Sequence, residues 1–414
     1  MTAIECQEQT YTVRLENGAT AEYILRGLDE DEIRAWSEFC ASVFSYKKNP
    51  PSADYFYRHY ANDPTTKAPG SSKLIRVAIF EGSMVASCRV FLKEISTGNK
   101  QQKGPNSFVS GGIGEVCTDI NHRRRGISKK LLENAIAIME DRSEVQVSSL
   151  HAAPTFFPLY ESLGYSAPPL SNPFGANRWS TVNLNWKPNC NKELAQNNPG
   201  IQIRPAQFPT DTKVLQQLHT KYSEDRLVGC ILRSEEYWNE YLSKELEGSL
   251  HVLESNASTD SNEQQIVSWL SLNGHADSFS VQEFGIDSSL LQIDESLTID
   301  RVVGALVDRA IQDESNKEGT IPLDDTIYSL KLPGFVADDI RSVCAPKMNP
   351  QSFDWATQVT EIDRGWMYRG LGDGSSSTLA DEFLAFVRRT IRNDEDGNHH
   401  DRQREHFVWP SDSF

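Results

Sequence analysis

The spacing of apolar side chains changes repeatedly between helix and strand periods in the first half of the chain. After an acidic first turn, apolar residues three and four apart predict a helix over residues 28–46, and Pro50-Pro51 ends it. A hairpin with strands over 74–80 and 84–92 follows. The remaining predicted elements are strands over 112–118, 145–150 and 180–186 and helices over 128–142 and 156–163. The strand over 180–186 is expected to close a first domain of residues 1–190.

A similar order of elements begins again after a polar linker over residues 187–200. The second half predicts strands over 201–205, 250–253, 266–272 and 279–286 and helices over 213–222, 234–244 and 300–313. Between two of these strands, residues 255–264 are polar and low in complexity, as in a flexible hairpin loop. This mixture indicates an α/β (α+β) fold with a second lobe over residues 200–414.

Composition and charge narrow the classes of function. The 414 residues have a formal net charge of −17, which disfavours binding to nucleic acid or to an anionic membrane. No apolar run reaches the roughly 20 residues that a membrane-spanning helix needs, and the polar start does not resemble a signal peptide. The seven cysteines include no C-x-x-C pair, so we expect neither a disulfide framework nor a metal site. A cytoplasmic protein with a small-molecule partner is therefore expected. The acidic surface favours a cationic partner, or it only aids solubility.

A basic turn over residues 123–128 joins a predicted strand to a predicted helix. Its glycine, Gly126, allows the backbone to approach a ligand closely. The first amides of the helix have no partners within the helix, and the helix dipole adds positive potential there. These features predict a pyrophosphate site. The alternative is a solvated turn whose three arginines bind nothing.

The strand, the turn and the helix together resemble the R/Q-x-x-G-x-G/A cofactor signature of the Gcn5-related N-acetyltransferase (GNAT) superfamily. Arg123, Gly126 and Ser128 occupy its fixed positions, and Ser128 departs conservatively from Gly or Ala. The resemblance implies acetyl-coenzyme A as co-substrate, with its pyrophosphate on the turn amides and its pantetheine arm along the preceding strand. It also implies tandem GNAT-like lobes, each a mixed, splayed sheet flanked by helices. The cofactor-binding residues that it implies are Val116, Cys117, Thr118, Arg123, Arg124, Arg125, Gly126, Ile127, Ser128 and Lys129.

Acetyl transfer to an amine requires a neutral amine, a donor for the oxyanion and a proton for the leaving thiolate. Residues 159–165 resemble the last motif of the superfamily, in which a Tyr four residues before a Gly protonates the thiolate of coenzyme A. That residue is Tyr160 here. A phenol with a pKa near ~10 suits a proton donor at neutral pH. The alternative is a helix tyrosine that only packs on the core.

Two residues are candidates for the base that deprotonates the amine. Glu115 lies on the predicted cofactor strand, and His151 lies at the exit of the next strand. Either side chain could relay a proton through water, although a His in this position is as often a structural hydrogen-bonding group. Cys117 is expected to pack in the core, because direct transfer needs no acyl-enzyme.

Some short segments are similar to the mycobacterial aminoglycoside acetyltransferases of the enhanced-intracellular-survival type. These segments are residues 121–126, 150–152 and 159–160. That group places a C-terminal Phe carboxylate in the active site, and Phe414 ends this chain.

The whole-chain plan resembles the fungal lysine N6-acetyltransferases of lysine catabolism more fully. Residues 364–369 and 406–412 are similar to the tail of that group. The second half lacks the cofactor signature, so the second lobe is expected to shape the substrate cleft. Trp366 and Tyr368 either line that cleft or pack in the core.

The favoured substrate is therefore a small cationic amine, with the ε-amine of free L-lysine as the first choice. An aminoglycoside or a polyamine is the alternative acceptor. A non-catalytic sensor of acyl-coenzyme A is the main alternative function, but it would not need Tyr160. A P-loop nucleotide site is disfavoured, because G-x-x-x-x-G-K-[ST] is absent.

Overall fold

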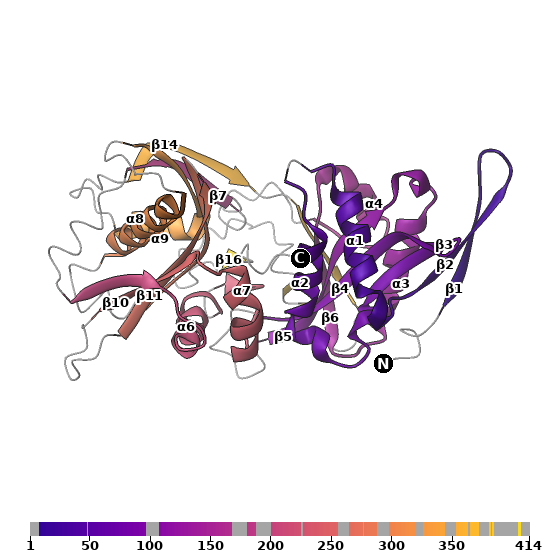
Figure 1. Cartoon of the computed structure of the whole chain (residues 1–414), viewed down its shortest axis with the longest axis horizontal. Helices are drawn as coiled ribbons and strands as arrows, with labels where there is room; N and C mark the ends of the chain where they lie inside the picture. Colours follow the sequence, from indigo (N-terminus) through magenta and orange to yellow (C-terminus); the bar gives the residue numbers. More distant parts are fainter. Residues whose placement is uncertain are drawn as a thin grey trace, which may run out of the picture.

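The structure is a computed structural model of the chain. It describes residues 8–47, 49–96, 107–167, 180–187, 200–224, 227–255, 265–275, 277–287, 298–318, 326–343, 353–362, 365–371, 381, 383–384 and 405–406. Two lobes lie side by side, each built on a seven-stranded mixed sheet of described strands (Figure 1). The α/β fold class with two lobes is confirmed. No described helix has the length and apolar character needed to span a membrane.

The first lobe contains one sheet with helices on both faces. Its strands, in sheet order, are β1 (Gln9–Arg14), β2 (Thr20–Gly27), β3 (Ile75–Phe80), β4 (Ser83–Ser96), β5 (Ser107–Thr118), β6 (Val145–His151) and β15 (Trp366–Gly370). Its helices are α1 (Ile33–Phe44), α2 (Ala53–Ala61), α3 (Ile127–Glu140) and α4 (Phe157–Glu161). Short 3₁₀ turns are η1 (Glu30–Glu32), η2 (Pro64–Lys67), η3 (Ser71–Leu74), η4 (Ile120–His122) and η5 (Pro154–Phe156). Among the described strands of this sheet, only β5 and β6 pair in parallel.

The second lobe has a related plan. Its strands, in sheet order, are β14 (Phe353–Ile362), β7 (Ser180–Trp186), β13 (Tyr328–Pro333), β12 (Ser278–Ile286), β11 (Gln265–His275), β10 (Leu250–Ser255) and β8 (Ile201–Pro205). Its helices are α6 (Thr212–His219), α7 (Ser243–Glu245), α8 (Ile299–Glu318) and α9 (Gly334–Val343), with π-helices η7 (Thr220–Glu224) and η8 (Tyr237–Leu242). A small parallel pair joins β9 (Leu227–Val228) to β16 (Glu405–His406).

Apolar stripes on the helices of the first lobe explain why they cover its sheet. On one face, Trp36 and Cys40 of α1 are buried, and the Trp36 indole donates a hydrogen bond to Ser87 Oγ at 2.8 Å. On the opposite face, α3 buries Leu131, Leu132 and other apolar residues against the sheet. Burial of these stripes excludes water from both faces and stabilises the layers.

The two lobes exchange strands. β7, from the first half of the chain, lies between β13 and β14 in the second sheet, and Figure 1 shows it among the strands of that lobe. Conversely, β15, from the second half, pairs with β6 in the first sheet. The predicted strand over 180–186 is therefore confirmed, but the prediction that it closes the first domain is wrong. Its alternating apolar residues, Val182, Leu184 and Trp186, fit the inner face of any sheet, so their pattern could not identify the partner.

Backbone and side-chain contacts also join the lobes. The end of β4 pairs with the segment after β9, where Ser96 N donates to Cys230 O at 2.8 Å and Leu232 N donates to Glu94 O at 2.8 Å. Near η8, the Lys244 ammonium donates to Asn62 Oδ1 at 2.8 Å. The strand exchange and these bonds make the lobes structurally interdependent.

The strand exchange can be tested at Met367. This residue belongs to β15, and its side chain is fully buried in the core between the first sheet and α3. Met367→Ala should lower the free energy of unfolding by about 2–5 kcal/mol, since it leaves a cavity. Urea unfolding followed by circular dichroism measures this change. The control is Val359→Ala on β14, which is 59% exposed and should change stability by no more than about 0.5 kcal/mol. Equal effects of the two substitutions would contradict the position of β15.

Candidate active site

The parallel strands β5 and β6 separate part of the way along their length. Their pairing runs from Val109 opposite Val145 to Ile113 opposite Leu150. β5 continues beyond this point to Thr118, while its other edge still pairs with β4. Residues 116–118 therefore have one edge bonded to β4, and the edge toward β6 is left outside the β5–β6 pairing. This is the strand predicted to bind the pantetheine arm.

A β-bulge at Glu115 changes the direction of β5 at the point of separation. Ser87 opposes Cys117 and Arg89 opposes Gly114, so one residue of β4 faces two residues of β5. Glu115 has a φ of 54°, in the left-handed region that non-glycine residues rarely adopt. Bulges of this kind turn a side chain to the other face of a sheet and often lie next to active sites. Here the Glu115 side chain reaches α2.

The turn before α3 is held by hydrogen bonds from two sides. Arg123 Nε donates to Thr118 O at 3.0 Å, and Tyr11 Oη donates to Arg125 O at 3.0 Å. Gly126 precedes α3 with a φ of 76°, and a Cβ added there would lie 2.7 Å from Tyr11 Oη. Both the positive φ and the short distance that a Cβ would have to Tyr11 Oη therefore favour glycine at this position.

The first turn of α3 is open to an anion. It contains no acidic residue, and no side chain caps its amides. Ser128 Oγ lies 2.7 Å from Thr118 Oγ1, which joins the helix start to the end of β5. These uncapped amides and the helix dipole are compatible with the anion site that the sequence predicts.

The basic side chains of the turn have different surroundings. The Arg125 guanidinium donates to Tyr23 Oη at 2.6 Å and to Asn121 O at 2.7 Å, so it supports the turn. Arg124 is exposed, with a φ of 60°. Arg124 and Lys129 form no hydrogen bond with the described part of the chain, which leaves both cations available to an anion.

Tyr160 lies on α4 in the core of the first lobe and is 7% exposed. Its ring packs edge-on against Tyr165, with 6.2 Å between the centroids. Burial raises the pKa of the Tyr160 phenol to about 12, so it remains protonated at neutral pH. Both predicted roles, packing and proton donation, are compatible with this environment.

Five charged or titratable side chains gather on the α2 side of β4 and β5. We call them the buried charge cluster: His59, Asp63, Arg89, Lys93 and Glu115. Glu115 Oε1 lies 3.4 Å from His59 Nδ1 and 3.7 Å from Arg89 Nη1. Asp63 Oδ2 accepts a hydrogen bond from Lys93 Nζ at 3.0 Å. Burial favours the neutral form of Asp63, but Lys93 and Arg89 outweigh it and lower the pKa of this carboxyl.

Two atoms of the buried charge cluster are buried without a hydrogen-bond partner, namely Glu115 Oε2 and Arg89 Nη1. Buried polar atoms are rarely left unsatisfied, so their presence indicates a place where a ligand or water binds.

Aromatic rings from both lobes surround the buried charge cluster. The His59 ring stacks on Tyr55 at 5.6 Å and lies 5.5 Å from Tyr241 of the second lobe. Apart from Glu115, the members of this cluster were not predicted, because they come from α2, the start of η2, β4 and β5 and share no local pattern. The run of aromatic residues over 55–60 was the one signal that could have indicated it.

The other predicted residues lie elsewhere around the strand separation. His151 is exposed at the end of β6, and its ring lies edge-on to Trp366 at 5.3 Å. Trp366 and Tyr368 are buried on β15 in a cluster of apolar residues. Cys117 is also buried, and its sulfur lies 3.9 Å from the sulfur of Cys40, as expected for core packing.

Phe414 lies outside the described residues. Among the described residues, no three His, Cys, Asp or Glu side chains gather as metal ligands would.

Comparison with known proteins agrees with this geometry. The family model for the acetyltransferase (GNAT) domain matches residues 25–167. A GCN5-related N-acetyltransferase from Kribbella flavida is 13% identical, with a TM-score of 0.53 over 89% of this chain and 74% of that chain. Another from Anabaena variabilis is 11% identical, with a TM-score of 0.51 over 84% and 72%.

A third structure, Eis1 from Mycobacterium abscessus, is 12% identical, with a TM-score of 0.47 over 88% and 76%. None of the curated proteins searched matches this chain. At 11–13% identity, the Kribbella and Anabaena structures show similarity of fold alone. The family model adds a match in sequence, which spans the strand separation, the turn before α3 and Tyr160. The chain therefore carries, in residues 25–167, an acetyltransferase domain of the GNAT superfamily.

Proposed function

We propose that the protein transfers an acetyl group from acetyl-coenzyme A to the ε-amine of free L-lysine. The observation that carries the proposal is the end of the β5–β6 pairing at Ile113 and Leu150, beside the uncapped start of α3. An extended thioester arm fits along residues 116–118, and its pyrophosphate fits the amides over 124–129. Arg124 and Lys129 supply positive charge for the phosphates.

In this proposal the acetyl group moves directly from sulfur to nitrogen. The amine forms a bond to the acetyl carbon and loses a proton, and the bond from that carbon to sulfur breaks. Tyr160 donates a proton to the departing thiolate, and its raised pKa keeps that proton in place until then. The burial of Cys117 and its contact with Cys40 support transfer without an acyl-enzyme.

Glu115 is the stronger candidate for the base. Its carboxylate is buried on the α2 face of the sheet, and Oε2 has no hydrogen-bond partner, so it can accept a proton from an amine or an intervening water. His59 and Arg89 lie close to Oε1 and hold the carboxylate in position. His151 lies at the exposed end of β6 and is the alternative relay.

Three features support a small cationic acceptor. The chain has a formal net charge of −17. The second lobe lacks the cofactor signature yet contributes Tyr241 to the wall around His59, so both lobes enclose the buried charge cluster. The whole-chain plan resembles the fungal lysine N6-acetyltransferases. An enclosed site suits a free amino acid better than a peptide.

Gly126→Asp should weaken the binding of acetyl-coenzyme A at least roughly tenfold, or about 1.4 kcal/mol. The substitution adds a negative charge at the pyrophosphate site, strains a positive φ and places an atom against Tyr11. Titration calorimetry measures the affinity. The control is Gly82→Asp in a hairpin turn, where φ is 78° and a Cβ meets no atom within 4 Å. Equal affinities in the two folded variants would exclude this turn as the pyrophosphate site.

Tyr160→Phe should lower kcat roughly a hundredfold or more while the affinity for acetyl-coenzyme A stays nearly unchanged. Only the proton donor is lost, since the ring remains in the core. Tyr165→Phe is the control, because its hydroxyl bonds Ser148 at 2.6 Å and has no proposed role in transfer. Steady-state kinetics at saturating amine distinguish the two variants. A normal kcat in Tyr160→Phe would assign thiolate protonation to another group.

Glu115→Gln should lower kcat/KM for the amine by roughly a hundredfold, because glutamine cannot accept the proton. The loss should shrink as the pH rises toward the amine pKa of about 10.4, where the amine is already neutral. The control is Glu81→Gln. Glu81 has a positive φ of 49°, as Glu115 does, but it lies in an exposed turn, so this substitution should leave activity unchanged. If His151→Gln shows the pH-dependent loss instead, His151 is the base.

Free L-lysine should be acetylated only at N6, with a rate that rises with pH across the neutral range. Mass spectrometry of a panel containing lysine, polyamines, aminoglycosides and histone-tail peptides measures the preference. Lysine within peptides should react slowly, since the enclosed site excludes a long chain. Comparable rates on peptides or aminoglycosides would contradict the lysine assignment and leave the acetyltransferase assignment standing.

A further inference from the structure

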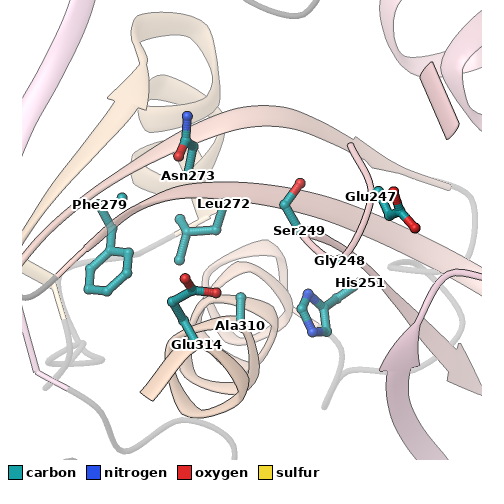
Figure 2. A pocket seen from close by; sticks show the side chains of 10 residues that line it. Glu247, Gly248, Ser249, His251, Leu272, Asn273, Phe279, Ala310 and Glu314 are labelled. Carbon is teal, nitrogen blue, oxygen red and sulfur yellow. The ribbon is translucent and has the colours of Figure 1, made fainter. Parts of the chain in front are cut away.

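A cavity of about 200 Å³ lies in the second lobe, apart from the strand separation of the first lobe. It is bounded by residues 247–251, the β11–β12 hairpin and α8 (Figure 2). Leu272, Phe279 and Ala310 form an apolar wall. The volume is several times that of one water molecule, so the cavity can hold a small organic ligand.

One wall of the cavity holds a buried histidine with an unsatisfied atom. His251 is 2% exposed, and its Nε2 lies 2.9 Å from Asp313 Oδ2. Asp313 also accepts hydrogen bonds from Arg309 Nε at 3.0 Å, and these two neighbours outweigh burial and lower the pKa of its carboxyl. Because an ionised carboxylate can only accept, Nε2 carries the proton in this pair.

The tautomer determines what the cavity offers to a ligand. With the proton on Nε2, His251 Nδ1 presents a lone pair and acts as an acceptor. This Nδ1 is buried and has no hydrogen-bond partner. A buried acceptor without a donor indicates a site where a donor binds.

The two carboxylates among the described residues that line the cavity belong to Glu247 and Glu314. Glu314 is half-buried on α8, and Figure 2 shows its carboxylate directed across the cavity toward Leu272, whereas the Glu247 side chain points away. No Lys or Arg is among the described residues that line it. An acceptor nitrogen, a carboxylate and an apolar wall complement an ammonium group on a short alkyl chain.

We propose that this cavity binds a primary alkylammonium ion, with the ammonium between His251 Nδ1 and Glu314 and the alkyl chain against Leu272 and Phe279. An anion is disfavoured by the carboxylates, and a metal ion lacks a set of three ligands among the described residues. The inference does not depend on the proposed acetyl transfer. It gives the second lobe a binding site of its own.

The test uses the full chain and n-butylammonium as the probe, with butanol and butyrate as neutral and anionic controls. The ring nitrogen resonances of His251 are followed by NMR, and the signal is assigned by its loss in His251→Gln. Butylammonium should shift this signal saturably, and the two controls should not. A signal unmoved by butylammonium at tens of millimolar, or one moved equally by butanol or butyrate, would overturn the proposal.

Substitutions distinguish butylammonium binding in this cavity from binding at the proposed acetyl-acceptor site. Glu314→Gln should weaken the binding that the His251 signal reports at least roughly tenfold, whereas Glu115→Gln in the first lobe should leave it unchanged. Glu235→Gln removes the same charge from an exposed position that does not line the cavity, and should also have no effect. Equal affinities in Glu314→Gln and the unsubstituted chain would show that Glu314 does not hold the ammonium and would overturn the proposal.

Discussion

The separation of β5 from β6 beyond Ile113 and Leu150 determines where the other parts of the candidate site lie. It leaves one edge of residues 116–118 outside the β5–β6 pairing, and unpaired strand edges bind extended ligands through backbone hydrogen bonds. The bulge at Glu115 lies at the same point and directs a carboxylate to the opposite face of the sheet. The turn that follows ends at Gly126 and presents the amides of α3. A single break in strand pairing thus brings together an edge outside the β5–β6 pairing, the uncapped start of α3 and a buried carboxylate.

The strand exchange explains how β6 can separate from β5 without losing support. Its outer edge pairs with β15 along Val147 to His151, so the strand remains bonded on one side where it leaves β5. Met367 of β15 packs in the core of the first lobe, and Trp366 lies edge-on to His151. The second lobe is therefore part of the framework of the first, in addition to forming a wall of the buried charge cluster through Tyr241.

The elements with local signals could be predicted from the sequence, and those set by distant contacts could not. Helical spacing identified α1, α3 and α8, and the turn at Gly126 could be predicted because its glycine and basic residues are contiguous. The edge strand β1, its neighbour β2 and the helix α2 were not predicted. In the buried charge cluster, Glu115 contacts His59, which lies 56 residues earlier in the sequence, and the strands β3 and β4 come between them along the chain. No sequence period encodes such a contact. The exchange of β7 was also unpredictable, because its apolar alternation fits either sheet.

Hydrogen–deuterium exchange with and without coenzyme A measures whether the cofactor binds at the separation of β5 and β6. If the ligand lies in the separation of β5 and β6, exchange should slow at the amides of residues 116–118 and of residues 124–129. Both segments should respond together, since one ligand would bridge them. Exchange that is unchanged in both segments at saturating coenzyme A, with protection confined to other parts of the chain, would contradict binding at this separation.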